Sequence, residues 1–222
     1  MSVARFQPRS SARQSAAKPR DSALTKIRIL ECATREFSEH GYAGARIEAI
    51  VRAADVNISL LYQYFESKEK LFIAVMEGAY ALMRASHRDF DVRDKEPIEA
   101  MESLTRWTFR IFVDHPEIIG LLNSENVSRG RHIEKSPYIK GLYNPLLDTI
   151  RGVLERGSAK QVFRSDVDPQ DLFVSMNGVG YFYLSNRHTL GVILNRDLMA
   201  AESLDRHEDH IVQVILGFLR PV

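Results

Sequence analysis

Apolar residues in this 222-residue chain recur at spacings of three and four from Leu24 almost to the C-terminus. This spacing places them on one face of an α-helix, because an α-helix completes a turn in about 3.6 residues. No stretch alternates apolar and polar residues over the length of a strand, and no two such stretches flank a hairpin turn. The sequence therefore predicts an all-α fold.

Four helices are expected in the N-terminal third. The first runs from Leu24 to Gly41, since glycine commonly follows the last residue of a helix. A short second helix covers 46–54, with these residues facing inward: Ile47, Ile50, Ala53 and Ala54. Asp55 can adopt the left-handed conformation that the next turn needs.

Asn57 is a suitable N-cap for a third helix that ends near Phe65. Ser67 is expected to cap a longer fourth helix, which fades between His87 and Asp94. Two short helices joined by a tight turn and supported by another helix form a helix-turn-helix, the unit that places its second helix in the major groove of DNA.

Further helices are expected in the rest of the chain. Asp168 is the expected N-cap of one of them, and Pro169 suits its first position, where a missing N–H costs nothing. The segment 127–137 is polar and is predicted to be a loop. The predicted helices are 98–114, 116–126, 138–156, 169–186 and 201–219.

The net charge of +1 hides an uneven distribution, since basic residues outnumber acidic ones in 1–72 and the reverse holds afterwards. Residues 1–23 lack helical periodicity and are interpreted as a flexible arm. An anionic partner at this end would explain the excess of basic residues, and a solvated tail is the alternative. The basic residues of the arm are Arg5, Arg9, Arg13, Lys18 and Arg20.

Several classes of protein do not fit the sequence. The single cysteine, Cys32, excludes a disulfide framework and is expected to be buried in a helix. No run approaches the ~18 apolar residues of a membrane span, and the N-terminus lacks the apolar core of a secretory signal, so a cytoplasmic protein is expected. No nucleophile elbow, phosphate-binding glycine loop or zinc pattern occurs. His207 and His210 alone are too few for a metal site. We expect no enzyme, metal or cofactor.

About fifty residues, from Leu24 to Val75, resemble the DNA-binding domain of the tetracycline-repressor (TetR) family of bacterial regulators. Departures from the family pattern are Asp55 for glycine, Asn57 for serine, Ala45 for threonine, and Ile58 and Leu60 for polar residues, so no base preference carries over. The matching residues are Phe37, Gly41, Tyr42, Ile50, Ala54, Val56, Leu61, Tyr62, Tyr64, Phe65, Ser67, Lys68, Glu69 and Leu71.

The resemblance implies an arm (1–23), a helix-turn-helix domain (24–72) and a larger helical domain for effector binding and dimerisation (73–222). It also implies a regulator of transcription, most simply a repressor that a small molecule releases from a palindromic operator in double-stranded DNA. The last two long helices would form the homodimer. The alternatives are a helical ligand-binding protein or enzyme without DNA control, and a regulator that responds to a protein partner.

The resemblance also implies roles for individual residues. Tyr62, Tyr64 and Lys68 would contact phosphates, which position a protein without reading sequence. Asn57, Ser59 and Leu60 would read bases, and Ile58 and Arg46 could do so as well. For Ile58 and Leu60, the alternative is that the side chain is partly buried in the domain. The candidate effector-binding residues are Trp107, Ile111, Glu125, Asn126, Tyr143, Met176, Asn177 and Tyr181.

Overall fold

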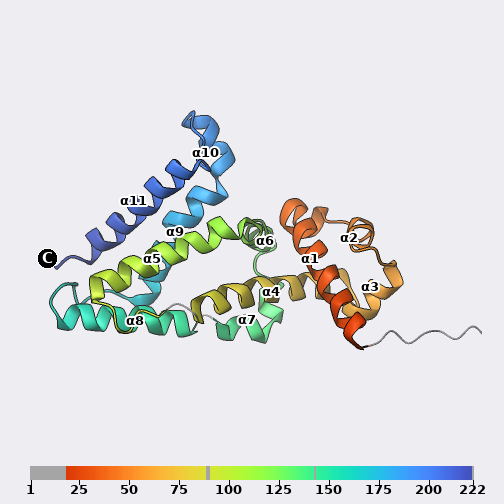
Figure 1. Cartoon of the computed structure of the whole chain (residues 1–222), viewed down its shortest axis with the longest axis horizontal. Helices are drawn as coiled ribbons and strands as arrows, with labels where there is room; N and C mark the ends of the chain where they lie inside the picture. Colours follow the sequence, from red (N-terminus) through yellow and green to blue (C-terminus); the bar gives the residue numbers. More distant parts are fainter. Residues whose placement is uncertain (1–18, 89–90, 143, 222) are drawn as a thin grey trace, which may run out of the picture.

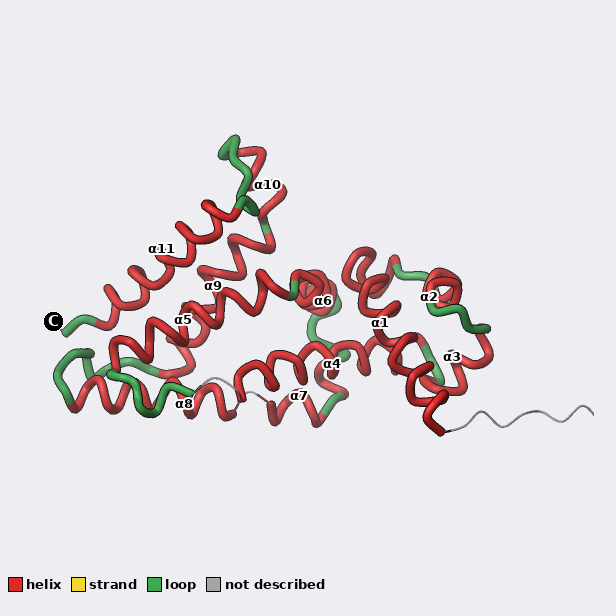
Figure 2. Tube along the Cα trace, in the orientation of Figure 1, coloured by secondary structure: helices red, strands yellow, loops and turns green. Residues whose placement is uncertain are grey.

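The computed structural model describes residues 19–88, 91–142 and 144–221 (Figure 1). Every regular element in these ranges is a helix, which confirms the all-α prediction (Figure 2). The elements are α1 (Pro19–Gly44), α2 (Ile47–Ala53), α3 (Ile58–Phe65), α4 (Lys68–Arg88), α5 (Pro97–Asp114), α6 (Pro116–Val127), the 3₁₀ turn η1 (Ile133–Lys135), α7 (Pro137–Leu142), α8 (Asn144–Ala159), α9 (Pro169–Ser185), α10 (Arg187–Ile193) and α11 (Ala201–Leu219).

The helices form a small group and a large group. Helices α1, α2 and α3 gather at one end of the molecule, whereas α5, α8, α9 and α11 form the larger body, with the C-terminus at its far end (Figure 1). Helix α4 runs from the small group along α7 towards the large one, and α6 packs on α1. None of the helices in the described ranges is both long and apolar enough to cross a bilayer.

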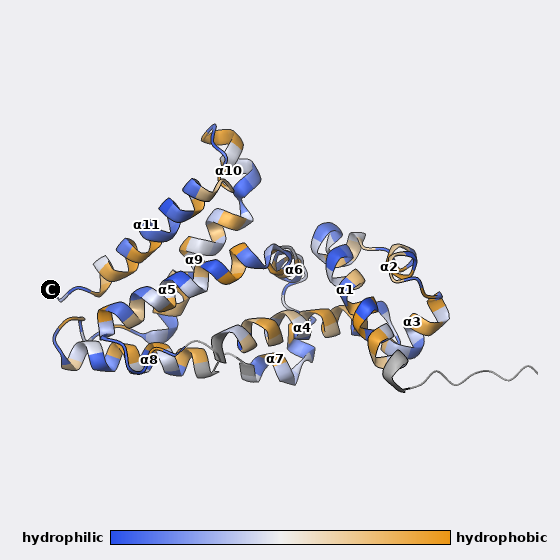
Figure 3. Ribbon diagram, viewed as in Figure 1, coloured by the Kyte–Doolittle hydropathy of each residue, from blue (hydrophilic) through white to orange (hydrophobic). Residues whose placement is uncertain are grey.

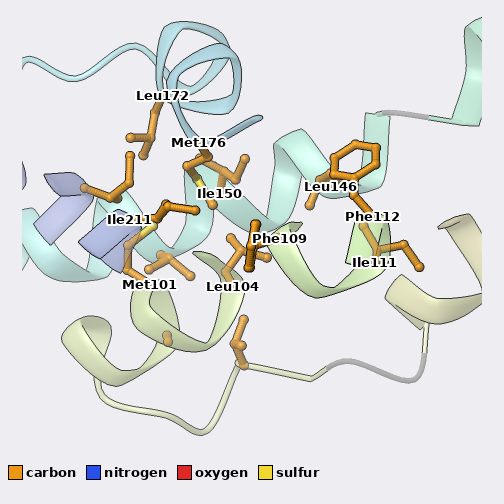
Figure 4. Close-up of a cluster of buried hydrophobic side chains, with 14 of the residues drawn as sticks. Met101, Leu104, Phe109, Ile111, Phe112, Leu146, Ile150, Leu172, Met176 and Ile211 are labelled. Carbon is orange, nitrogen blue, oxygen red and sulfur yellow. The ribbon is translucent and has the colours of Figure 1, made fainter. Parts of the chain in front are cut away.

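Each group has its own apolar core, and α4 takes part in both. Phe37, Leu61 and Phe72 are completely buried in the core of the small group. Leu82 of α4 packs against the core of the large group, which includes Met101, Leu104, Phe109, Ile150, Met176 and Ile211 (Figure 4). The expected domain boundary at residue 72 therefore falls inside one continuous helix, which joins the two groups without a linker.

Local chemistry fixes several of the predicted helix ends. Gly41, the predicted end of the first helix, lies at a kink within α1 and has a φ of 67°, and Asp55 after α2 has a φ of 50°, both in the left-handed region. The side chain of Asn57 accepts a hydrogen bond of 2.8 Å from the backbone N–H of Leu60, which is the predicted N-cap. Asp168 caps α9 in the same way, and Pro169 is its first residue.

Two details of the small group differ from the prediction. Helix α1 begins at Pro19, five residues before the expected start, so the expected arm overlaps a helix at 19–23, and residues 1–18 lie outside the described ranges. Proline suits a first helical position because it has no N–H to leave unpaired. Ala53 is exposed rather than inward-facing, because the buried face of α2 is formed by Ile47, Ile50 and the residue after it, Ala54.

The helix expected over 138–156 corresponds to α7 and α8, with residue 143 between them outside the described ranges. Two details of the large group differ from the prediction. The segment expected to be a polar loop contains η1 and two buried polar residues, His132 and Ser136. Helix α10 was not predicted.

Candidate nucleic-acid interface and effector cavity

Helix α3 has one buried and one exposed face. Leu61 and Phe65, which are separated by one turn, anchor it in the core of the small group. The opposite face exposes Ile58, Ser59 and Tyr62 to solvent. Three of the residues for which the sequence suggests base or phosphate contact therefore share an accessible surface at the end of the molecule.

Three further candidates lie at the edges of this surface. Asn57 is exposed, but its side chain is occupied as the cap of α3, and Leu60 is half-buried. Arg46 is exposed at the start of α2, and its backbone N–H donates to Oε1 of Glu36 at 2.9 Å. This bond ties the main chain at the start of α2 to α1.

Tyr64 and Lys68 differ in how far they are available to an added phosphate. The phenol of Tyr64 is half-buried and donates its single proton to the carbonyl of Ser22 at 3.2 Å, while its oxygen lies 2.8 Å from the Ser22 hydroxyl. The ammonium of Lys68 donates to the carbonyl of Ala45 at 2.6 Å. An ammonium has three protons, so Lys68 keeps two for a further acceptor, whereas Tyr64 would have to exchange its partner.

The surroundings of Lys68 also influence its charge. Its ammonium lies 5.1 Å from the centre of the Tyr42 ring, in a partly buried position. Burial lowers the pKa of Lys68, and the nearby carboxylates of Glu36 and Glu48 oppose that shift. A bound phosphate would act in the same direction as the two carboxylates and favour the protonated form.

A hollow beside α3 contains two arginines that the sequence analysis missed. Arg28 of α1 and Arg52 of α2 are both exposed and line this hollow together with Asn57 and Leu60. In the sequence they are ordinary exposed helical arginines, and only the packing of α1 on α2 brings them beside α3.

A narrow cavity lies in the large group, between α4, α5, α8 and α9. Its volume is about 40 Å³, which is room for a few water molecules. Three of the expected effector residues, Trp107, Ile111 and Asn177, are among its lining residues. The others are Tyr80, Met83, Arg84, Thr108, Phe112, Leu146 and Phe173.

Four other expected effector residues lie elsewhere. Met176 is buried in the apolar core, and the phenol of Tyr181 donates to Oδ1 of Asn123 at 2.6 Å. Burial raises the pKa of Tyr181. Glu125 and Asn126 lie at the end of α6, and Tyr143 is outside the described residues. The lining residues of α4 carry no signal in the sequence, because only the fold brings α4 beside α5, α8 and α9 at this cavity.

Glu125 belongs instead to a buried junction between the two groups of helices. Its Oε2 lies 2.6 Å from Nδ1 of His132, and its Oε1 accepts from the backbone N–H groups of His132 and Ile133 at 2.8 and 3.0 Å. The His132 ring packs against Tyr42 and Phe72, with centroids 4.4 and 4.8 Å apart. The segment after α6 is thus bonded to α6 and packed on the core beneath α3.

The His207–His210 pair shows no arrangement suited to a metal ion. His207 stacks on the ring of Tyr183 with 3.8 Å between centroids, and burial lowers its pKa. Within residues 19–88, 91–142 and 144–221, no group of three or more potential metal-binding side chains converges.

Known proteins resemble the chain along most of its length. A family model described as bacterial regulatory proteins, tetR family, matches residues 29–75, and one described as tetracyclin repressor-like, C-terminal domain, matches residues 97–215. The HTH-type transcriptional repressor NicS of Pseudomonas putida is 34% identical over 186 residues, which are 84% of this chain and 88% of NicS.

A second relative and a solved structure extend the comparison. The HTH-type transcriptional repressor SCO4008 of Streptomyces coelicolor is 34% identical over 114 residues, 50% of this chain and 54% of that protein. The structure of a TetR transcriptional regulator of Chloroflexus aurantiacus shares the fold, with a TM-score of 0.66 and 21% identity over 91% of this chain and 100% of that one. The chain therefore belongs to the TetR family and is a DNA-binding transcriptional regulator with a helix-turn-helix.

Proposed function

We propose that this protein is a repressor that binds a palindromic operator as a homodimer and leaves it when a small molecule binds the larger domain. The observation that carries the proposal is the exposed face of α3, which holds Ile58, Ser59 and Tyr62 clear of the core. NicS and SCO4008, which are both named as repressors, support the direction of control.

On the operator, α3 enters the major groove and divides its contacts into two kinds. Ile58 and Ser59 face base edges, with Asn57, Leu60 and Arg46 at the margin of that surface. Tyr62 and Lys68 hold phosphates, and Tyr64 does so if it gives up its bond to Ser22. Arg28 and Arg52 add two positive charges on the hollow side of α3.

The effector enters between α4 and α5 at the cavity that Trp107, Ile111 and Asn177 help to line. Ligand pockets commonly have volumes of ~300–1,000 Å³, so the cavity must widen for binding. Because α4 also packs under α3, a displacement of its cavity end is transmitted to the DNA-binding surface. This coupling is how effector binding would lower operator affinity.

The homodimer forms through α9 and α11. Val174, Gly178 and Phe182 follow one another at intervals of four on the exposed side of α9, and Val214 and Phe218 do the same on α11. A two-fold axis through these faces pairs each with its counterpart and places two recognition helices ~34–36 Å apart, one turn of DNA.

The proposal is tested by gel-shift titration with the DNA upstream of the protein's own gene. Tyr62→Ala should weaken binding to operator and to unrelated DNA alike, because a phosphate contact carries no sequence information. Tyr138→Ala is the matched control, since Tyr138 is similarly exposed but lies in α7. Equal affinity of the Tyr62 variant and wild type would remove Tyr62 from the interface. A wild-type protein that shifts no upstream fragment at low salt would argue against operator control altogether.

A further inference from the structure

Helix α10 is a short helix with an apolar C-terminal end that projects from the end of the molecule. It joins α9 to α11 and stands beyond the body that they form, with hydrophobic residues at its tip (Figures 1 and 3). None of its residues is buried. Val192, Ile193 and Leu194 are 81, 75 and 59% exposed. Three consecutive large apolar side chains exposed at the end of a seven-residue helix are unfavourable in water, and such a short helix has little stability of its own.

The inner side of this segment is nevertheless firmly attached. The Arg196 N–H donates to the carbonyl of Gly191 at 3.0 Å, and its guanidinium donates to the Ser203 hydroxyl at 3.1 Å. The Tyr183 phenol donates to the carbonyl of Leu198 at 2.9 Å, and the Leu198 side chain is buried. The apolar tip is therefore presented on a fixed support, which reduces the entropy lost when a partner covers it.

The apolar tip adjoins the two helices of the proposed dimer surface, because α10 directly follows α9 and precedes α11 (Figure 1). Val174, Phe182, Val214 and Phe218 on α9 and α11 are between 41 and 64% exposed. Val192, Ile193, Leu194 and the neighbouring Met199 are together at least as exposed as those four. A standard protein–protein interface buries ~800 Å² of surface and 20–30 residues on each partner. Two helix faces alone supply few residues towards that number. The tip enlarges the apolar surface available to the same partner.

We propose that α10 and the turn up to Met199 are a third dimerisation element, whose apolar tip packs on a second copy of this chain. The inference rests on the dimer of the proposed function. In this proposal, the connection between α9 and α11 extends the interface beyond the two α9 helices and the two α11 helices of the dimer. A second copy is the occupant because the tip adjoins the surface through which α9 and α11 meet their counterparts.

The test measures the dimer dissociation constant of the full chain by sedimentation equilibrium. Val192→Glu should raise it at least tenfold, because a carboxylate in place of an apolar side chain would lose its water when the second copy covers it. Val127→Glu is the matched control: Val127 is 86% exposed at the end of α6, away from α10, and its change should leave the constant within twofold of wild type. Far-UV circular dichroism checks that both variants keep the helical content of wild type.

A second variant separates this inference from the dimer itself. Val214→Glu places the same charge on α11 and should also weaken the dimer. An unchanged constant for Val192→Glu beside a raised constant for Val214→Glu would overturn the role of α10 and leave the α9–α11 dimer standing. A wild-type protein that is monomeric at tens of micromolar would overturn both. A tenfold rise for Val192→Glu, with Val127→Glu unchanged, supports the third element.

Discussion

Replacing Gly120 by alanine should separate α6 from α1 at the point where the two groups of helices meet. A Cβ built at Gly120 lies 2.2 Å from the carbonyl oxygen of Ser38 and 2.9 Å from its carbonyl carbon. Both atoms belong to the backbone, so no side-chain rotation relieves the clash, and the helices must move apart by about 1 Å. The hydrogen bond of 2.7 Å from the Tyr42 N–H to the Ser124 hydroxyl lies in the same contact and would lengthen.

The size of the effect follows from two opposing contributions. Inserting a methyl group into a packed contact costs about 1–3 kcal/mol, and we expect the upper part of that range because the obstacle is main chain. Alanine in place of glycine within a helix returns about 0.5–1 kcal/mol. The free energy of unfolding should therefore fall by roughly 2 kcal/mol. Operator affinity should fall as well, since α1 supports α3.

Gly152→Ala provides the control for this prediction. Gly152 lies inside α8, and a Cβ there meets no atom within 4 Å. The same chemical change should raise the free energy of unfolding by about 0.5–1 kcal/mol. Urea denaturation followed by circular dichroism measures both variants. If Gly120→Ala proved as stable as Gly152→Ala, the close approach of α6 to Ser38 would not exist in solution.

Three further changes test other parts of the structure. Lys68→Ala should weaken binding to all DNA sequences and lower the slope of log affinity against log salt by about one; a changed base preference at one position would contradict a phosphate contact. Deleting residues 1–18, which leaves α1 intact, should keep the melting temperature and reduce affinity most at low salt, whereas equal affinity throughout a salt titration would make the arm inert. Glu125→Gln should destabilise the fold by about 1–3 kcal/mol, because an amide NH₂ group would replace one of the two carboxylate oxygens that now bond His132 and Ile133. Wild-type stability in urea would mean that the junction tolerates the loss of this acceptor.

Features fixed by local chemistry could be predicted from the sequence. The cap at Asn57, the turn at Asp55 and the proline at the start of α9 each depend on a few neighbouring residues. The anchoring of α3 by Leu61 and Phe65 follows from the spacing of four residues on a helix. These features are visible without knowing what the rest of the chain does.

Features that depend on packing between distant segments could not be predicted. The bond between Glu125 and His132 spans a bend whose course the intervening residues do not specify. The bond between Tyr64 and Ser22 joins residues 42 positions apart, and Ser22 lies in a stretch that the sequence indicates as an arm. Helix α10 was missed because its apolar residues face outward, so no helical stripe distinguishes its inner side.

The division of α3 into two faces affects how readily the operator preference can change during evolution. Truncating a buried leucine such as Leu61 typically costs 2–5 kcal/mol, whereas substitutions at exposed positions usually change stability by less than about 0.5 kcal/mol. Ile58, Ser59 and Tyr62 therefore lie at positions where many amino acids are compatible with folding. Duplicated copies of such a gene could come to recognise new operator sequences through single substitutions, and the protein would remain folded after each one.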